Sequence, residues 1–240
     1  LLHSSRSKFV FLQASQGTAQ LWAPNSADAS AVVDRRPILE GSRIVTDNAT
    51  KAVLTLSIDE AGQSVLATVQ LSPNTSVQLE EARSPRFNVS QDPHRAELAL
   101  GSGRLFLTVQ EADQRDVQIR VVTPNAAVDL KSGAFDVAAD ETEMRVRVRS
   151  GTARVESEGR VAEVNAGERV NVLAGRPPEF PVSDTVNLIV NGTFVQKLAP
   201  LWEEFAEVKP GQQPGIVELI QDDRRNAVRF SRRTEEDVPN

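Results

Sequence analysis

The feature that most constrains the fold is a two-residue alternation of apolar and polar side chains, repeated in short segments along most of the chain. Its clearest example, residues 141–161 (ETEMRVRVRSGTARVESEGRV), places Met144, Val146 and Val148 on one face of a strand and arginines on the other. Glycine, proline, asparagine or aspartate interrupts such segments roughly every eight to twelve residues. Before residue 196 no stretch shows helical periodicity. The pattern predicts an all-β fold of many short antiparallel strands, arranged as a β-sandwich or β-roll.

Within residues 141–161, Ser150 and Gly151 are predicted to form a two-residue hairpin loop, because glycine supplies the positive φ that such loops need. In this register the apolar residues of the two arms fall opposite one another, which favours the pairing. Arg147 then faces Arg154. A like-charge rung of this kind costs a few tenths of a kcal/mol unless a carboxylate lies beside it.

Arginines on strands suggest a surface for a partner. Arg145, Arg147, Arg149 and Arg154 are the candidate partner-contact face, and a merely solvated face is the alternative. The composition argues against nucleic acid as that partner: 33 acidic residues outnumber 27 basic ones, the net charge is −6, and tyrosine is absent. Nucleic-acid-binding domains usually have a basic excess, often with aromatic side chains for stacking.

No catalytic, cofactor-binding or metal-ligating constellation is evident. The chain has no cysteine, which excludes disulfides and thiolate chemistry, and its two histidines, His3 and His94, are far apart in sequence. Carboxylates cluster in polar stretches such as residues 140–143, which are typical of solvated loops. Calcium binding there is the one cofactor interaction that we consider, although the spacing fits no EF-hand. The sequence therefore predicts a protein that is not an enzyme.

The 240 residues suit one large or two ordinary domains. Residues 1–13 begin Leu-Leu-His-Ser-Ser and are predicted to be a membrane-proximal segment after a transmembrane helix or signal sequence; an arbitrary chain boundary is the alternative. Residues 14–175 are predicted to form the β domain. Residues 176–185 are proline-rich and are predicted to be a linker. Residues 186–240 would then form a second, incomplete unit.

Residues 14–175 resemble the FecR-type domain. Residues 38–58 (ILEGSRIVTDNATKAVLTLSI) are similar to its Gly-x-x-Ile-x-Thr motif. Residues 121–156 are similar to its block of Thr-Pro-x-Ala-x-Val, a Gly-Thr-x-Phe strand and a hairpin that turns at a glycine. Residues 161–175 are similar to its closing Ala-Gly-Glu turn. One position departs from the pattern, since Ala134 replaces the threonine of Gly-Thr-x-Phe. We interpret this as a change at a structural position.

Residues 187–202 (NLIVNGTFVQKLAPLW) resemble the start of galactose-binding-like jelly rolls, which serve as carbohydrate-binding modules. Asn191, Gly192, Phe194 and Trp202 match the sandwich-start motif. Such modules are longer than this unit, so the resemblance implies a fold fragment. A short amphipathic helix beginning near Pro200 is the local alternative.

The FecR resemblance implies a membrane-anchored bacterial protein, exposed in the periplasm or outside the cell. It would act in envelope signalling of the sigma-factor-regulator type through contacts with another envelope or membrane protein. The alternative is a structural or adhesive subunit of an envelope assembly, with glycan binding by the C-terminal module. A carbohydrate-active enzyme whose catalytic part lies elsewhere is a third reading.

Overall fold

The computed structural model describes residues 5–7, 9–85, 92–111, 115–184, 216–222 and 225–231. Every regular element in these ranges is a β-strand, so the prediction of an all-β fold is confirmed. The chain divides into two compact units, residues 1–185 and residues 186–240. In the part of the chain that is described, no helix has the length and apolar character of a membrane span.

The described strands of the first unit are connected in one hydrogen-bonded sheet, which folds into two layers. We name these layers the front sheet and the back sheet, and they share three long strands, β10 (His94–Val109), β12 (Ala127–Ala139) and β13 (Glu143–Ser157). The front sheet contains, in order, β4 (Ala29–Val32), β3 (Ala19–Trp22), β6 (Arg43–Val45), β9 (Ser76–Pro85), β10, β11 (Val117–Val122), β12, β13 and β14 (Arg160–Asn165), and β1 (Ser5–Ser7) pairs with the end of β9. The back sheet contains β5 (Arg36–Ile38), β2 (Phe9–Gln16), β7 (Lys51–Ser57), β8 (Val65–Leu71), β10, β12, β13, β15 (Glu168–Leu173) and β16 (Val182–Ser183).

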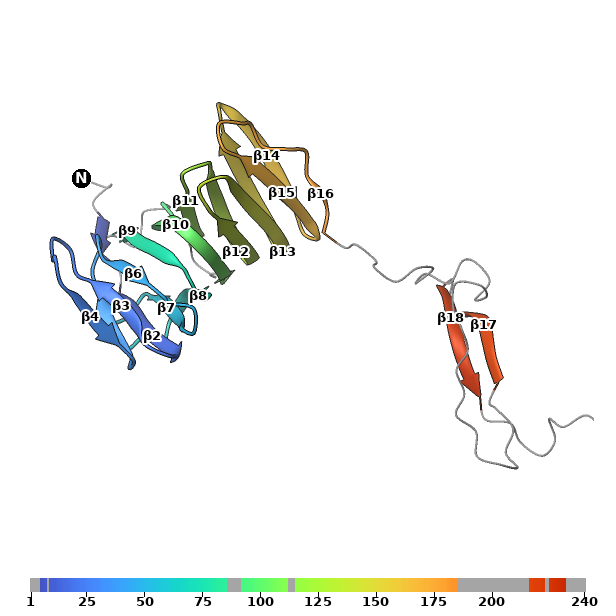
Figure 1. Ribbon diagram of the computed structural model, residues 1–240, viewed down its shortest axis with the longest axis horizontal. Helices are drawn as coiled ribbons and strands as arrows, with labels where there is room; N and C mark the ends of the chain where they lie inside the picture. Colours follow the sequence, from blue (N-terminus) through green and yellow to red (C-terminus); the bar gives the residue numbers. More distant parts are fainter. Residues whose placement is uncertain are drawn as a thin grey trace, which may run out of the picture. The chain divides into compact units, whose positions relative to one another are not determined.

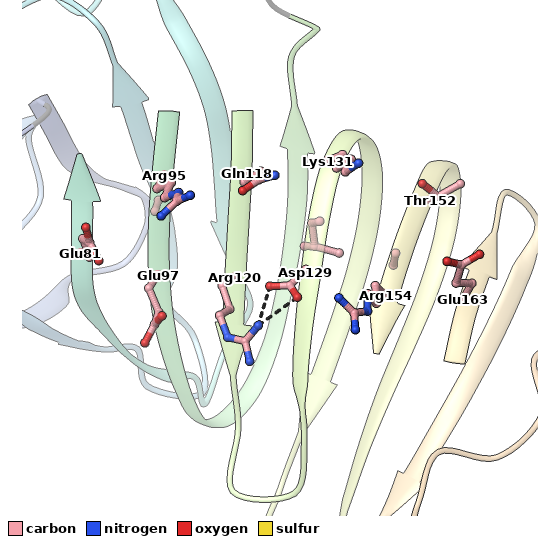
Figure 2. A pocket seen from close by; sticks show the side chains of 13 residues that line it. Glu81, Arg95, Glu97, Gln118, Arg120, Asp129, Lys131, Thr152, Arg154 and Glu163 are labelled. Atoms are coloured by element: carbon pink, nitrogen blue, oxygen red, sulfur yellow. Dashed lines mark hydrogen bonds and ion pairs between the residues drawn. The ribbon is translucent and has the colours of Figure 1, made fainter. Parts of the chain in front are cut away.

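Each long strand gives one half to each sheet. The first half of β10 pairs with β9 and β11, whereas its second half, from Gly103 onward, pairs with β8 and β12. The buried positions change parity between the two halves, for example from Leu98 and Leu100 to Leu105 and Leu107. In Figure 2, β12 and β13 curl over near Lys131 and Thr152. The bends carry the chain from one sheet to the other.

The inner faces of the two sheets enclose a single hydrophobic core. Leu12, Leu54 and Phe135 of the back sheet and Ile44 and Leu98 of the front sheet are all fully buried. In Figure 1 the strand pairs of this unit follow one another from the blue N-terminal strands to the yellow β14 and β15. The first unit is therefore a β-sandwich whose apolar positions are the alternating ones seen in the sequence.

The predicted hairpin at Ser150 and Gly151 is wrong. Strand β13 continues through both residues and pairs with β12 before and after them, with register shifts between Leu130 and Gly133 and between Ala134 and Phe135. The chain reverses earlier, between β12 and β13, at residues 140–142. A glycine with positive φ serves a bend within a strand as well as a turn between strands, and Gly151 has φ +83°.

The termini of the first unit extend beyond the boundaries expected from the sequence. Residues 9–13, assigned to a membrane-proximal segment, lie in β2, where Val10 and Leu12 are buried. Residues 176–184, assigned to the linker, run beside β15: Glu179 donates its N–H to the carbonyl of Asn171, and β16 pairs with β15.

The described part of the second unit is one antiparallel hairpin of β17 (Ile216–Asp222) and β18 (Arg225–Ser231). Asn191, Gly192, Phe194 and Trp202, the expected start of a jelly roll, lie outside the described residues. The resemblance of this unit to carbohydrate-binding modules is therefore unconfirmed.

Candidate contact surfaces on the two sheets

The outer face of the front sheet holds a groove of about 650 Å³ that crosses β9 to β14 (Figure 2). Charged side chains alternate along it, because Glu97, Arg120, Asp129, Arg154 and Glu163 are successive partners in the strand pairing. We name this set the front charge row. Opposite charges on neighbouring strands stabilise a sheet, and their Cβ atoms lie about 4.5–5.5 Å apart.

The groove is electrically balanced, since four acidic and four basic side chains line it. Arg120 donates from Nη1 to Asp129 at 2.7 Å (Oδ1) and 2.9 Å (Oδ2), and this is the pair joined by dashed lines in Figure 2. Both side chains are 39% exposed, so solvent screens the pair. In the front charge row Arg120 and Asp129 form an ion pair, and the other members lie beside opposite charges on neighbouring strands.

The outer face of the back sheet is different, because arginines gather where β10, β12, β13 and β15 pair. Phe106 of β10, Asp136 of β12, Arg147 of β13 and Arg169 of β15 form one row across four strands. Arg104, Arg145 and Arg149 lie on the same face around this row. We name Arg104, Phe106, Arg145, Arg147, Arg149 and Arg169 together the arginine face.

At the centre of this face, Arg104 forms a two-pronged ion pair with Asp136. Its Nε donates to Oδ1 at 2.7 Å, and its Nη2 donates to Oδ2. Asp136 is only 3% exposed although its position points outward, because the guanidinium covers it. The hydrogen bond to Asp136 raises the pKa of Arg104 above its usual value. Charge-assisted, planar pairs of this kind are the strongest polar contacts between side chains.

Phe106 lies between two arginines. The guanidinium carbon of Arg104 is 4.6 Å from the ring centroid and that of Arg149 is 5.7 Å from it. Arg149 belongs to β13, where it lies at a register shift between Val148, the partner of Phe135, and Ser150, the partner of Ala134. Ala134, which replaces the threonine of the FecR pattern, pairs with Thr108 of β10 and with Ser150 of β13.

The remaining arginines of the face share few carboxylates. Arg145 donates from Nη2 to Glu143 Oε1 at 3.0 Å. Arg147 Nε and Arg169 Nε lie 3.2 Å and 3.9 Å from the same oxygen, Asp184 Oδ1. Both Nε atoms are buried without a hydrogen-bond acceptor within the described part of the chain. One carboxylate therefore serves two opposed guanidinium groups.

The structure thus brings together three of the four arginines that the sequence singled out. Arg145, Arg147 and Arg149 lie on the back sheet, whereas Arg154 lies in the groove of the front sheet. The bend at Gly151 separates them. Arg104, Phe106 and Arg169 belong to the arginine face but were missed. Their own strands show the same alternation, but only the strand pairing brings them beside β13.

Other polar groups have structural partners. His94 is 7% exposed, and its Nδ1 forms a hydrogen bond with the Ser84 hydroxyl inside the sandwich. Asp140, in the acidic stretch considered for calcium, accepts hydrogen bonds from the hydroxyl and the N–H of Thr142 and from the N–H of Glu143. These bonds, the Thr142 hydroxyl first, lower the pKa of Asp140. Across the described ranges, no three His, Asp or Glu side chains group to hold a metal ion.

Fold and surfaces together define an all-β sandwich domain with charged outer faces. Residues 59–154 match the family described as FecR protein, so the FecR-type resemblance is confirmed for this part of the chain, which includes most of both faces. No curated protein gives a significant match.

Two solved structures are similar, both crystal structures of a protein from Parabacteroides distasonis described as a candidate anti-sigma factor. Each is 20% identical over 59% of this chain and 59% of its own, with TM-scores of 0.43 and 0.42. The chain thus spans about three fifths of these neighbours.

Proposed function

We propose that this chain is a non-enzymatic FecR-domain protein of the bacterial cell envelope that acts in signalling of the sigma-factor-regulator type. The observation that carries the proposal is the match of residues 59–154 to the FecR family. From the family resemblance we place the sandwich outside the cytoplasmic membrane, on a protein that is anchored in that membrane.

In this proposal the domain works through protein–protein contact. The arginine face supports it, because arginine and aromatic side chains are enriched where protein interfaces derive their affinity. The proposal of a non-enzymatic role is supported by the polar groups described above: Asp136, Asp140 and His94 are occupied by structural hydrogen bonds or ion pairs.

The test is genetic. We expect deletion of the gene in its own bacterium to change the transcripts that depend on one extracytoplasmic sigma factor, and complementation with the intact gene to restore them. A matched strain complemented with a gene that lacks the codons for residues 59–154 should keep the defect. If no sigma-factor-dependent transcript responds to the deletion, the signalling role is wrong.

A role in assembly is the second candidate, and one edge of the sandwich favours it. Among the described strands, β14 pairs only with β13, so its other edge is open for a further strand. Large apolar side chains are exposed at the same end of the sandwich, namely Val161, Leu173, Phe180 and Val182. Sedimentation of the purified chain distinguishes the two roles, because an assembly subunit forms oligomers at micromolar concentration and a strictly monomeric chain contradicts that role.

A further inference from the structure

We infer that the arginine face is the docking site for an acidic segment of a partner protein, whose carboxylates bind Arg149 and the Arg147–Arg169 pair beside Phe106. The inference rests on the proposed function, since it identifies the chemistry of the partner. It also restricts the contact surface that the sequence suggested, because it excludes Arg154.

The arginine face has more positive than negative groups. Among the described residues, the five guanidinium groups of the arginine face form ion pairs with three carboxylates, those of Asp136, Glu143 and Asp184. The groove of the front sheet has four groups of each sign. The excess on the arginine face occurs in a chain whose net charge is −6, so it is local to one surface. Such a surface attracts an acidic partner and repels a basic one.

Three guanidinium groups of the arginine face, those of Arg147, Arg149 and Arg169, have no carboxylate of their own among the described residues. Arg149 contacts the ring of Phe106 but forms no ion pair within the described residues. Arg147 and Arg169 lie opposite one another, and the single carboxylate of Asp184 pairs with both of them through their Nε atoms. Like charges at one rung destabilise a sheet. A second carboxylate from a partner relieves this repulsion and pairs with the guanidinium groups.

The Arg104–Asp136 pair shows which anion suits the surface. There a planar carboxylate receives two parallel hydrogen bonds from one guanidinium, and that guanidinium also lies over Phe106. Arg149 lies over the same ring, although at 5.7 Å, and its guanidinium pairs with no carboxylate among the described residues. A glutamate or aspartate of the partner completes at Arg149 the arrangement that Asp136 already makes at Arg104.

The experiment measures binding of a fluorescein-labelled peptide of eight glutamates to the full 240-residue chain at low salt by fluorescence anisotropy. Two variants are compared, Arg149→Glu and Arg154→Glu. They change the net charge equally and lie on the same strand, but on different sheets. We expect Arg149→Glu to weaken binding at least about fivefold and Arg154→Glu to stay within about twofold of the unchanged chain, since a direct charged contact is worth about 1 kcal/mol or more.

Arg149→Ala and Arg154→Ala repeat the comparison without an added acid, and equal thermal unfolding of the variants shows that folding is unaffected. Equal losses in the two variants mean non-specific attraction, and they overturn the inference. So does an unchanged chain that fails to bind the peptide. A third arm uses a labelled oligothymidine of eight nucleotides: if it binds more tightly than the peptide and depends on Arg149, the site is for phosphate and the inference is wrong.

The binding result and the genetic test are independent. If the peptide binds through Arg149 but deletion of the gene leaves sigma-factor-dependent transcripts unchanged, the docking site stands and the signalling role fails. If the transcripts respond but a strain carrying Arg149→Glu signals like one carrying Arg154→Glu, the signalling role stands and the docking site is wrong.

Discussion

Gly133 of β12 and Gly151 of β13 lie directly opposite one another, at the point where both strands bend from one sheet to the other. Both have positive φ, +145° and +83°. A Cβ atom on Gly151 would lie 2.2 Å from the carbonyl oxygen of Ser132 and 3.1 Å from the Cα of Gly133. The two backbones approach so closely because neither residue has a side chain.

Replacing Gly151 by alanine should therefore be strongly destabilising. The positive φ alone costs an alanine roughly 1–2 kcal/mol, and the clash with backbone atoms brings the expected loss to about 3 kcal/mol or more. The measurement is the free energy of unfolding from urea titration followed by circular dichroism. Gly159→Ala is the matched control, because Gly159 has φ +69° and open space around it. Equal losses in both variants would show that the close approach has no energetic weight.

Removing one partner of a half-buried ion pair should cost more than removing one from an exposed pair. Arg104→Ala leaves the 3% exposed carboxylate of Asp136 without its guanidinium, and we expect a loss of about 2 kcal/mol. The loss is smaller than for a fully buried pair because Arg104 is 43% exposed. Arg120→Ala removes an arginine–aspartate pair in which both side chains are 39% exposed, and it should cost at most about 1 kcal/mol. Denaturant titration gives the free energy of unfolding of both variants. A larger loss for Arg120→Ala than for Arg104→Ala would contradict the greater weight given to the Arg104–Asp136 pair.

Acid should weaken the turn between β7 and β8 through Asp59. Hydrogen bonds from the N–H of Gln63 and from Ser64 lower the pKa of Asp59 to about 2 from 3.8. A carboxylate with a lowered pKa stabilises the folded state above pH 3.8, and the contribution is lost as the pH falls toward 2. The difference in Tm between the unchanged chain and Asp59→Asn should therefore shrink across this range.

Glu60→Gln is the control for Asp59→Asn, because it removes the same charge from the same turn without touching these hydrogen bonds. A Tm difference for Asp59→Asn that stays constant from pH 5 to pH 2 would refute the role of Asp59.

The threonine of the Gly-x-x-Ile-x-Thr motif should matter for its hydroxyl. Thr46 is 2% exposed; its Oγ1 donates to the carbonyl of Ser72 at 2.7 Å and accepts from the N–H of Thr75 at 2.9 Å. Thr46→Val keeps the shape but leaves the N–H of Thr75 unpaired, which costs about 1–3 kcal/mol. Thr55→Val, on the outer face of β7, should stay within about 0.5 kcal/mol. The measurement is the free energy of unfolding of both variants from denaturant titration. A Thr46→Val variant as stable as the unchanged chain would contradict the role of the Thr46 hydroxyl.

Alternation predicted which side chains are buried more reliably than it predicted where the chain turns. Met144, Val146 and Val148 are buried and Arg145 and Arg147 face outward, as the two-residue period requires. The hairpin at Ser150 failed because the register of a strand with its neighbour depends on residues remote in sequence. Arg147 faces Asp136 and Arg169 in the structure, and not Arg154.

The sequence by itself determined that this protein consists of strands and which face of each strand is apolar, because both follow from the local period of the side chains. The tertiary structure alone decided that glycines at positions 133 and 151 bend two strands together, which separates Arg154 from the arginine face and brings Arg104 and Phe106 to it. The reason is physical: a glycine permits positive φ wherever it stands, and only the partner strand selects a bend over a turn.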